Sequence, residues 1–355
     1  MKKFFGDFFE EKKVLITGHT GFIGSWLAIC LNELGAKVTG YSLPPYTKDD
    51  NFVVTNLQEK LMNNFGDIRD FDNLLKVFRT AQPDIIYHLA AQPIVRKSYS
   101  IPKETYDINV GGTVNIFEIF RKLDSTKILL NFTTDKCYEN QEKSARYKET
   151  DRVGGYDPYS SSKACSELIT STYHRSFFSS KNKKFVSSIR SGNVIGGGDW
   201  QEDRLIPDCM VSMRNNEPIN IRNPEYVRPW QYVLEPIRGM LTLTKKMWNE
   251  GTKYSWAWNF GPKENSIFSV RDIVEKIINY IEKGSYNVVK KQEDSILHET
   301  KLLLLDSTKA EKELGWITIL NIDETIKLVC DWYMAEEINY EFDVNQIKYY
   351  FNKLN

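Results

Sequence analysis

A tyrosine and a lysine four residues apart form the first pattern that fits acid–base chemistry. The run Y-S-S-S-K, from Tyr159 to Lys163, opens a stretch with helical character that continues to about residue 178. Positions i and i+4 share one face of a helix, so the phenol and the ammonium are predicted to point at the same spot. A nearby cation favours the ionised phenol and makes it usable as an acid or base near neutral pH. For this pattern alone, a solvated Tyr and Lys on a helix face is the alternative.

A second polar stretch stands at the end of a predicted strand over residues 127–134. There the sequence reads T-T-D-K, from Thr133 to Lys136. In open parallel sheets, ligands bind outside the carboxyl ends of the strands, and catalytic side chains collect there. We therefore expect Thr134, Asp135 and Lys136 to lie at a ligand site.

A glycine-rich turn provides the context for that site. The sequence V-L-I-T-G-H-T-G-F-I-G-S-W, residues 14–26, reads as a strand, a tight turn with glycines at 18, 21 and 24, and the start of a helix over residues 25–34. Glycine allows positive φ and a close approach of the backbone to a pyrophosphate, and the helix N-terminus offers free N–H groups. The pattern predicts a dinucleotide site rather than a plain glycine-rich turn.

The end of the second predicted strand, residues 36–42, does not show which dinucleotide binds. An acidic residue usually stands there and holds the adenosine ribose. Here the chain has Tyr41 and Ser42, and no Asp or Glu lies between Ala36 and Lys48. The choice between NAD and NADP therefore cannot be made from this position.

Strand and helix patterns alternate along the chain and predict an α/β fold, a Rossmann-type doubly wound parallel sheet with a smaller mixed α/β substrate-binding lobe. Further strands are predicted at 84–91, 185–190 and 256–260, together with a short strand that ends at 66–68 and a loop over 43–64. Helices are predicted at 70–80, 105–123 and 159–178, and cap helices at 204–216, 236–248 and 270–282. We assign 1–190 mainly to the dinucleotide-binding domain and 191–335 mainly to the lobe, with 230–262 partly returning to the sheet. Residues 336–355 are predicted to be a C-terminal helical appendage.

Composition limits the partners. The 355 residues contain 47 Lys plus Arg and 47 Asp plus Glu, so nothing in the charge points to nucleic acid or to a membrane surface. The five cysteines are widely spaced and read as free thiols in a reducing cytosol, without a metal site. The N-terminal segment is neither a signal peptide nor a membrane span, and we expect a cytoplasmic protein. His88, alone in an apolar run, is interpreted as a core histidine rather than a ligand or base.

Nine short motifs in one order resemble the extended short-chain dehydrogenases/reductases and, within them, the CDP-glucose 4,6-dehydratases. They extend from about residue 10 to 262, with a weaker family-like ending at 305–316. The motifs are G-H-T-G-F-I-G-S-W, H-L-A-A-Q-P-I-V-R, T-T-D-K-C-Y-E-N, G-G-Y-D-P-Y-S-S-S-K, R-S-G-N-V-I-G-G-G-D-W, E-D-R-L-I-P-D, I-R-N-P, R-P-W-Q-Y-V-L-E-P and L-D-S-T-K-A-E-K-E-L-G-W.

The resemblance implies NAD as the cofactor and assigns site residues by position. The residues implied to contact the cofactor are Gly18, Thr20, Gly21, Phe22, Ile23, Gly24, Asp67, Ile68, Leu89, Ala90, Ala91, Tyr159 and Lys163. Asn193, Arg204, Arg222 and Arg228 are implied to hold the substrate's diphosphate and nucleotide, a task that suits the planar fork of arginine. For any single arginine, a surface ion pair is the alternative.

The implied reaction is the NAD-dependent 4,6-dehydration of a nucleotide-diphosphate sugar, CDP-D-glucose to CDP-4-keto-6-deoxy-D-glucose, in deoxysugar biosynthesis for lipopolysaccharide O-antigen. Tyr159 takes the proton of the 4-hydroxyl, beside Thr134, while C4 passes hydride to NAD⁺. Asp135 protonates the departing 6-hydroxyl, and the hydride returns to C6. Lys136, where related dTDP-sugar dehydratases have a glutamate, either removes the C5 proton or stabilises the enolate.

Three alternatives remain at this stage: a nucleotide-sugar 4-epimerase, a dehydratase for another hexose or a heptose, and a non-catalytic dinucleotide-sensing regulator. The Asp135-Lys136 pair argues against the first and the Tyr159–Lys163 pair against the last. The resemblance also implies a homodimer formed by helices at about 101–122 and 160–178. Apolar residues that fit such a face, or equally the core, are Ile116, Phe117, Ile119, Phe120, Leu168, Ile169 and Phe177.

Overall fold

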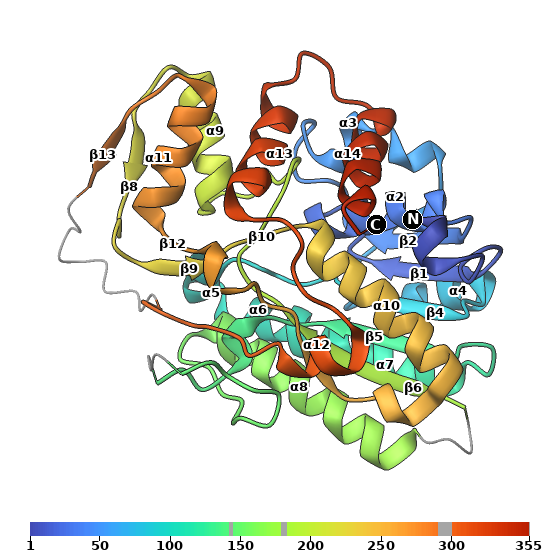
Figure 1. Cartoon of the computed structure of the whole chain (residues 1–355). Coiled ribbons are helices and arrows are strands. Elements are labelled where there is room, and N and C mark those ends of the chain that lie inside the picture. Colours follow the sequence, from blue (N-terminus) through green and yellow to red (C-terminus); the bar gives the residue numbers. More distant parts are fainter. Residues whose placement is uncertain (142–144, 179–182, 290–299, 355) are drawn as a thin grey trace.

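A computed structural model describes residues 1–141, 145–178, 183–289 and 300–354. Its centre is a seven-stranded parallel sheet in the order β11-β6-β5-β4-β1-β2-β3 (Figure 1). The strands are β1 Lys13–Thr17, β2 Lys37–Ser42, β3 Met62–Phe65, β4 Ile85–His88, β5 Ile128–Phe132, β6 Phe185–Arg190 and β11 Ala257–Asn259. The chain starts in the middle of the sheet and winds first to one edge and then to the other. This is the doubly wound topology that the sequence predicts.

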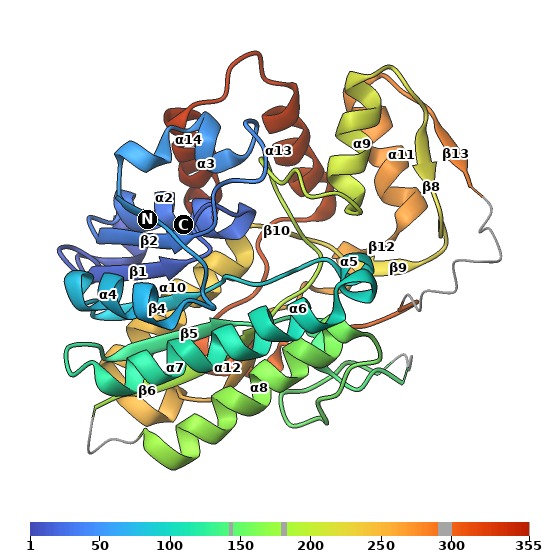
Figure 2. The ribbon, with the colours of Figure 1, turned by 180° about the vertical axis from the view of Figure 1, so that it is seen from behind.

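Helices cover both faces of the sheet, and successive strand residues alternate between two apolar cores. Leu15, Ile86 and Leu129 face one core, which contains α4 Phe71–Ala81, α7 Thr113–Lys122 and α8 Pro158–Phe177 (Figure 2). Ile16 and Tyr87 face the other core, with α2 Phe22–Glu33, α10 Leu234–Glu250, α13 Ile322–Met334 and α14 Tyr340–Asn352. Strands buried on both faces read as continuous apolar runs, as β4 does in the sequence.

Two predicted segments differ locally from expectation. The predicted loop at 43–64 contains α3 Asn51–Val54, η1 Leu57–Glu59 and most of β3. The predicted long helix at 105–123 is α6 Pro102–Tyr106, a π-helical turn η2 Asp107–Gly112, and α7. The π turn coincides with packing against a loop, because a Cβ at Gly112 would come within 2.4 Å of the Ile68 side chain. Such turns are frequent at functional sites.

The helix predicted at 236–248 packs on the central sheet, so its assignment to the cap is wrong. This helix, α10, packs against β5, and the Tyr87 hydroxyl on β4 lies 2.7 Å from Thr244 Oγ1. After α10 and η4 Gly251–Tyr254, the chain forms β11, which pairs in parallel with β6. The apolar face of α10 is buried because it covers strands, which amphipathic spacing alone cannot distinguish from packing against a lobe.

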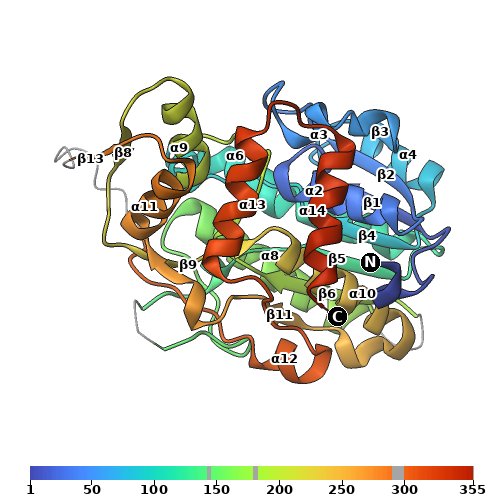
Figure 3. The ribbon, with the colours of Figure 1, turned by 45° about the horizontal axis from the view of Figure 1, so that its top comes forward.

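The C-terminal segment is part of the core, which corrects its description as an appendage. Helix α14 lies against α2, and its residues Val344, Ile347, Tyr350 and Phe351 are buried. Gln346 Oε1 accepts a hydrogen bond of 2.6 Å from the Tyr232 hydroxyl. Figure 3 shows α13 and α14 side by side across the α2 side of the sheet. Asn355, the last residue of the predicted appendage, lies outside the described residues.

The smaller lobe is built from segments late in the chain and lies at the carboxyl ends of the strands (Figure 1). It contains α9 Leu205–Arg214, α11 Val270–Ile281 and two small strand pairs. β8 Ile219–Ile221 runs parallel to β13 Tyr286–Val288, and β9 Val227–Pro229 runs antiparallel to β12 Ile267–Ser269. The pair β7 Val194–Ile195 and β10 Gln231–Tyr232 lies where the chain leaves and re-enters the large domain. The remaining short elements are α1 Lys2–Phe5, α5 Val95–Ser100, η3 Asp135–Cys137, η5 Glu264–Ser266 and α12 Thr308–Leu314.

The helices predicted to form a dimer face use most of their large apolar residues internally. Ile116, Phe117, Ile119 and Phe120 of α7 are all fully buried in the core beneath the sheet. These four residues therefore pack in the core and do not form a dimer face. On α8, in contrast, Leu168 and Phe177 are 55% and 45% exposed.

Candidate active site

A cavity of about 740 Å³ lies between the carboxyl ends of the strands and the smaller lobe. Its walls begin where strands end: Gly18 follows β1, Leu89 follows β4, and Ser191 follows β6. Every residue that the sequence predicts for cofactor, catalysis or substrate lines this one cavity. The tertiary structure thus brings together residues that are up to 210 positions apart, from Gly18 to Arg228.

The glycine turn has no room for side chains. Gly18 has φ +79°, and a Cβ there would come within 2.7 Å of the Ala90 backbone nitrogen. A Cβ at Gly24 would come within 2.1 Å of the Gly18 carbonyl oxygen, so α2 packs directly on the turn. Among the described residues, no side chain caps the N-terminus of α2. The free N–H groups of its first turn therefore remain available for an anion in the cavity.

Hydrogen bonds within and between loops hold the lining of the cavity near the end of β2. Thr20 Oγ1 lies 2.8 Å from Ser42 Oγ, at the end of β2, and donates to the Leu43 carbonyl oxygen at 2.9 Å. Asp67 accepts hydrogen bonds from the Arg69 guanidinium, which lower the pKa of that carboxyl group. Ile68 beside it packs against the π turn at Gly112.

Tyr159 and Lys163 lie on the first two turns of α8, which Asp157 caps by accepting from Ser160 N at 2.9 Å. Both side chains are buried, with 8% and 6% of their surfaces exposed. Burial raises the pKa of Tyr159 to about 12, although a hydrogen bond with Thr134 acts in the opposite direction. Burial lowers the pKa of Lys163 to about 8. The expectation that the lysine makes the phenol acidic is thus not met by the polypeptide alone. Desolvation is the largest effect on the pKa of Tyr159, and the cation that acts to lower it is Arg204.

Thr134, Asp135 and Lys136 lie just after β5, where Thr134 is the N-cap of the short helix η3. Thr134 Oγ1 donates to Asp135 Oδ1 at 2.9 Å and accepts from Lys136 N at 3.3 Å. Asn193 Nδ2 donates to Asp135 Oδ2 at 3.4 Å, so the asparagine predicted to contact a diphosphate also orients the acid. A Cβ at Gly192 would come within 2.1 Å of the same carboxylate. The carboxylate is therefore confined between this turn and the residues that follow β6.

The three predicted arginines come from three parts of the smaller lobe, and all reach the cavity. Arg204 pairs with Asp199 at 2.6 Å, and Arg222 with Asp203 at 3.0 Å. Arg228 donates to two backbone carbonyl oxygens, those of residues 227 and 301. Because arginine keeps its charge at any physiological pH, this wall of the cavity suits an anionic ligand.

Sequence reasoning missed one arginine of this wall. Arg96, at the start of α5, lines the cavity and lies 3.4 Å from Asp203, which also holds Arg222. Asp203 has φ +61°, an unusual conformation for a residue other than glycine. The signal was present, since Arg96 ends the motif H-L-A-A-Q-P-I-V-R just after β4. Only the tertiary structure shows that it joins the arginines of the smaller lobe.

His88 is a core histidine, as predicted. Its Nδ1 lies 2.7 Å from Thr17 Oγ1 and its Nε2 lies 3.2 Å from Thr113 Oγ1. Burial lowers its pKa to about 3, so the ring is neutral. All five cysteines are free thiols, and the described part of the chain holds no His, Cys, Asp or Glu cluster suited to a metal ion. None of the helices in the described ranges is both long and apolar enough to cross a bilayer.

Comparisons with known proteins agree with this architecture. The sequence profile of the family described as GDP-mannose 4,6 dehydratase matches residues 15–329. The chain is 42% identical to the CDP-glucose 4,6-dehydratase of Salmonella typhimurium over 333 residues, 93% of this chain and 92% of that protein.

Two solved structures share the fold. A dTDP-glucose 4,6-dehydratase from Streptomyces venezuelae, solved with NAD and TYD, superposes with a TM-score of 0.77 at 22% identity, over 90% of this chain and 96% of that one. A UDP-glucose-4-epimerase from Stenotrophomonas maltophila, solved with NAD and formylated UDP-arabinopyranose, gives a TM-score of 0.78 at 18% identity, over 91% and 98%. The chain therefore belongs to the GDP-mannose 4,6 dehydratase family, within the extended short-chain dehydrogenases/reductases that its motifs resemble.

Proposed function

We propose that the protein is an NAD-dependent 4,6-dehydratase that converts CDP-D-glucose to CDP-4-keto-6-deoxy-D-glucose. One observation carries the proposal: the glycine turn, the Tyr159–Lys163 pair, the Asp135-Lys136 pair and the arginines line one cavity. An epimerase needs the first two features but no acid for an elimination. The 42% identity to a CDP-glucose 4,6-dehydratase over nearly the whole chain supports the same reaction and the same nucleotide.

The cavity fits NAD on the evidence of its own residues. The glycine turn excludes every Cβ at positions 18 and 24, and the uncapped N-terminus of α2 supplies donors for a pyrophosphate. A dinucleotide there would extend from Asp67 and Ile68 at one end to Leu89, Ala90 and Ala91 at the other. Bound NAD⁺ would supply a hydride acceptor and, later in the cycle, the hydride donor.

Side chains of the protein carry out the proton transfer at the 4-hydroxyl. Tyr159 accepts the proton of the 4-hydroxyl, and Thr134 holds that hydroxyl in place. Lys163 lies one turn further along the same helix, and its ammonium, which donates to the Phe132 carbonyl oxygen, would favour the ionised form of the phenol. The pKa of Tyr159 is raised to about 12 in the folded chain, mainly by burial, so the phenol needs neighbouring positive charge before it can act as a base near neutral pH.

Residues of the turn after β5 carry out the elimination of water. Asp135 protonates the departing 6-hydroxyl, and its orientation is held by Thr134 and Asn193. Lys136 removes the C5 proton or stabilises the charge of the enolate. Arg204, Arg222 and Arg228 hold the diphosphate and nucleotide, which leaves the hexose between Tyr159 and Asp135.

A product analysis tests the proposal. Purified protein is incubated with NAD and, separately, with CDP-, dTDP-, UDP- and GDP-glucose and a nucleotide-activated heptose. We expect CDP-glucose to give a product lighter by one water, with deuterium entering C5 in deuterated solvent. An unchanged mass with inverted C4 would show an epimerase. A faster reaction with another sugar nucleotide would change the assigned substrate, and turnover of none would contradict the proposal.

We also propose that the protein acts in the cytoplasm, on a pathway to deoxysugars such as those of lipopolysaccharide O-antigen, and as a homodimer. Support for the dimer comes from α8, which lies beside α7 and presents Leu168 and Phe177 to solvent. Tyr106, at the end of α6, is 37% exposed on the neighbouring helical segment. Two such helix pairs from two copies would form a four-helix contact that covers these side chains.

A further inference from the structure

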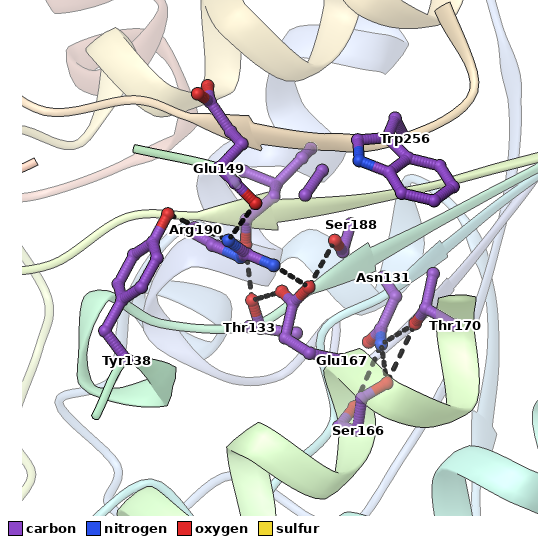
Figure 4. Close-up of polar contacts among 12 residues, drawn as sticks. Asn131, Thr133, Tyr138, Glu149, Ser166, Glu167, Thr170, Ser188, Arg190 and Trp256 are labelled. Carbon is purple, nitrogen blue, oxygen red and sulfur yellow. Dashed lines mark hydrogen bonds and ion pairs between the residues drawn. The ribbon is translucent and has the colours of Figure 1, made fainter. Parts of the chain in front are cut away.

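A carboxylate outside the predicted site ties the two catalytic segments together. Glu167 lies one turn beyond Lys163 on α8 and is 4% exposed. Its Oε1 accepts a hydrogen bond of 2.5 Å from Thr133 Oγ1, and its Oε2 accepts from Ser188 Oγ and Arg190 Nη2, each at 2.7 Å. Figure 4 shows Glu167 extending from α8 toward Thr133, Ser188 and Arg190.

Arg190 extends this network to Tyr138, Glu149 and β11. Its Nη1 donates to the Tyr138 hydroxyl at 2.8 Å and to the Glu149 carbonyl oxygen at 3.2 Å (Figure 4). The Tyr138 hydroxyl in turn donates to Asn259 Oδ1, on β11, at 2.7 Å. The network therefore connects α8, the end of β5, β6 and β11 behind the cavity.

Stability is a poor explanation for a charged pair at this depth. Glu167 and Arg190 expose only 4% and 6% of their side chains. A buried ion pair gains little over well-packed apolar residues, because both ions lose their hydration. Although burial alone acts to raise it, the Arg190 charge and the hydrogen bonds hold the pKa of Glu167 below its usual value, so the carboxylate stays ionised.

The location of the pair suggests what the charge does. Thr133 immediately precedes Thr134 and Asp135, so the hydrogen bond from Thr133 to Glu167 sets where that turn leaves β5. Glu167 itself lies on the helix that carries Tyr159 and Lys163. One side chain thus fixes the groups assigned to proton transfer at C4 relative to the group assigned to protonate the 6-hydroxyl.

We propose that Glu167, held by Arg190, is a positioning residue that aligns the Thr134-Asp135 turn with Tyr159 and keeps Lys163 protonated. This inference rests on the proposed function, because the aligned groups are those assigned to the dehydration. The electrostatic part follows from spacing: residues i and i+4 of a helix are neighbours, so the carboxylate favours the lysine's ammonium form. Burial lowers the pKa of Lys163 to about 8, and the negative charge of Glu167 opposes that lowering.

The test compares Glu167→Gln with Glu167→Asp. The Gln variant keeps the shape but loses the charge, so Lys163 should lose its proton at lower pH. We expect kcat to fall at least tenfold while KM stays within about threefold, because the substrate's arginine clamp is elsewhere. The alkaline limb of kcat should move down by about one pH unit. Glu167→Asp, which keeps the charge, should leave that limb within a few tenths of a unit of wild type.

Thr170→Val is the matched control. Asn131 Nδ2 donates to Thr170 Oγ1 and Ser166 Oγ, each at 2.9 Å, which is a second buried tie between β5 and α8 (Figure 4). This tie is uncharged and lies deeper in the sheet. We expect Thr170→Val to lower the unfolding temperature without moving the alkaline limb. An equal shift of the limb in Thr170→Val and Glu167→Gln would overturn the proposal, because general loosening would then explain both.

A second variant controls for misfolding, and two further measurements keep the test valid if the enzyme turns over no substrate. Glu167→Gln leaves Arg190 buried without its counter-charge, whereas the double variant Glu167→Gln with Arg190→Met leaves no unpaired charge. Hydrogen exchange of the amides of residues 133–137 and the pH dependence of NAD affinity need no substrate. We expect the amides of residues 133–137 to exchange faster in both variants than in wild type. As the pH rises, we expect the loss of NAD affinity to begin at a lower pH in both variants than in wild type. If wild type dehydrates no sugar nucleotide, only the proposed function fails; unchanged exchange and an unchanged pH dependence would overturn the positioning role.

Discussion

Lys163 Nζ donates a hydrogen bond of 3.2 Å to the carbonyl oxygen of Phe132, so the ammonium on α8 is attached to the last residue of β5. Burial lowers the pKa of this lysine to about 8 from an ordinary value of 10.5. That lowering corresponds to an unfavourable free energy of about 3 kcal/mol for the charged amine in the folded protein. The protein therefore holds a destabilising charge at its cavity.

Lys163→Met should raise stability at pH 7 and abolish turnover. The lowered pKa means that the unfolded chain binds more protons between about pH 8 and 10.5, so wild-type stability rises with pH across that window. The advantage of the variant should therefore be present at pH 7 and vanish near pH 10. After subtracting about 1 kcal/mol for the lost hydrogen bond, a gain of roughly 1–2 kcal/mol remains. Thermal unfolding at both pH values measures it, and a less stable variant at pH 7 would contradict this account.

Tyr159→Phe should remove turnover and keep the cofactor. The ring remains packed at the start of α8, while the group that transfers the proton is gone. Loss of a positioned acid–base group typically lowers the rate by about 10²–10⁴-fold. We expect kcat to fall by that factor and NAD affinity, measured by fluorescence titration, to change less than about threefold. Activity within a few-fold of wild type would remove Tyr159 from the mechanism.

Lys136→Ala and Asp135→Asn should stall the reaction at different points. Without Lys136, oxidation at C4 should continue because Tyr159 and Lys163 are unchanged, so the absorbance of reduced nicotinamide should build up on the enzyme. Solvent deuterium should enter C5 slowly or not at all. In Asp135→Asn, exchange at C5 should continue while loss of water slows, because the leaving hydroxyl lacks its acid.

The same pair of variants distinguishes the two roles of Lys136. A free lysine amine is largely protonated at neutral pH, with a pKa near ~10.4, which is unfavourable for a base. Mass spectrometry of recovered sugar nucleotide measures exchange and dehydration together. Normal exchange with lost dehydration in Lys136→Ala would exclude the base role and leave electrostatic stabilisation of the enolate.

Asp343→Asn should stabilise the protein above neutral pH. Asp343 is fully buried on α14, where its Oδ1 accepts from Trp332 Nε1 at 3.0 Å, and burial raises its pKa to about 7. A raised pKa means that the folded state holds the proton more tightly, so this contribution to stability is lost as pH rises from about 4 through 7. The amide resembles the protonated acid and cannot ionise. We expect a gain of no more than about 1 kcal/mol at pH 4.5 and of roughly 2–4 kcal/mol at pH 8.

Glu336→Gln, at an exposed acid before α14, is the control for Asp343 and should show no such pH dependence. Urea unfolding at the two pH values compares all three proteins. If the stability of wild type relative to Asp343→Asn does not fall between pH 4.5 and 8, ionisation of Asp343 has little effect on the free energy of unfolding, which would contradict this account.

Leu168→Glu should convert the proposed dimer to a monomer. Leu168 is 55% exposed on α8, so the substitution leaves the protomer's own core intact. Placing a carboxylate in an apolar contact between two copies removes it from water without a partner, which is unfavourable. Light scattering at micromolar concentration should give half the wild-type mass. Val211→Glu, at a 46% exposed residue of α9 in the smaller lobe, should stay dimeric. A monomeric wild type would refute the assembly.

Local patterns along the sequence were enough to determine the large domain's core elements and the chemistry that they carry. Alternating apolar runs and glycine positions predicted β1, α2, β4, β5 and β6, since each depends on contacts within a few residues and on burial in a parallel sheet. The Tyr159–Lys163 pair was readable for the same reason, because helical spacing alone puts i and i+4 on one face. Motif order then indicated the family before any long-range contact was known.

Only the tertiary structure decided which surfaces those elements bury. Helical spacing shows that one face of α10 and α14 is apolar, but not whether that face meets the sheet or a lobe, and both helices pack against the large domain. The opposite charges of Glu167 and Arg190 are 23 positions apart, and nothing local indicates that they meet behind Thr133. The pKa of Tyr159 likewise depends on the desolvation of a cavity that forms only when distant segments pack, so helical spacing suggested a more acidic phenol than the folded chain has.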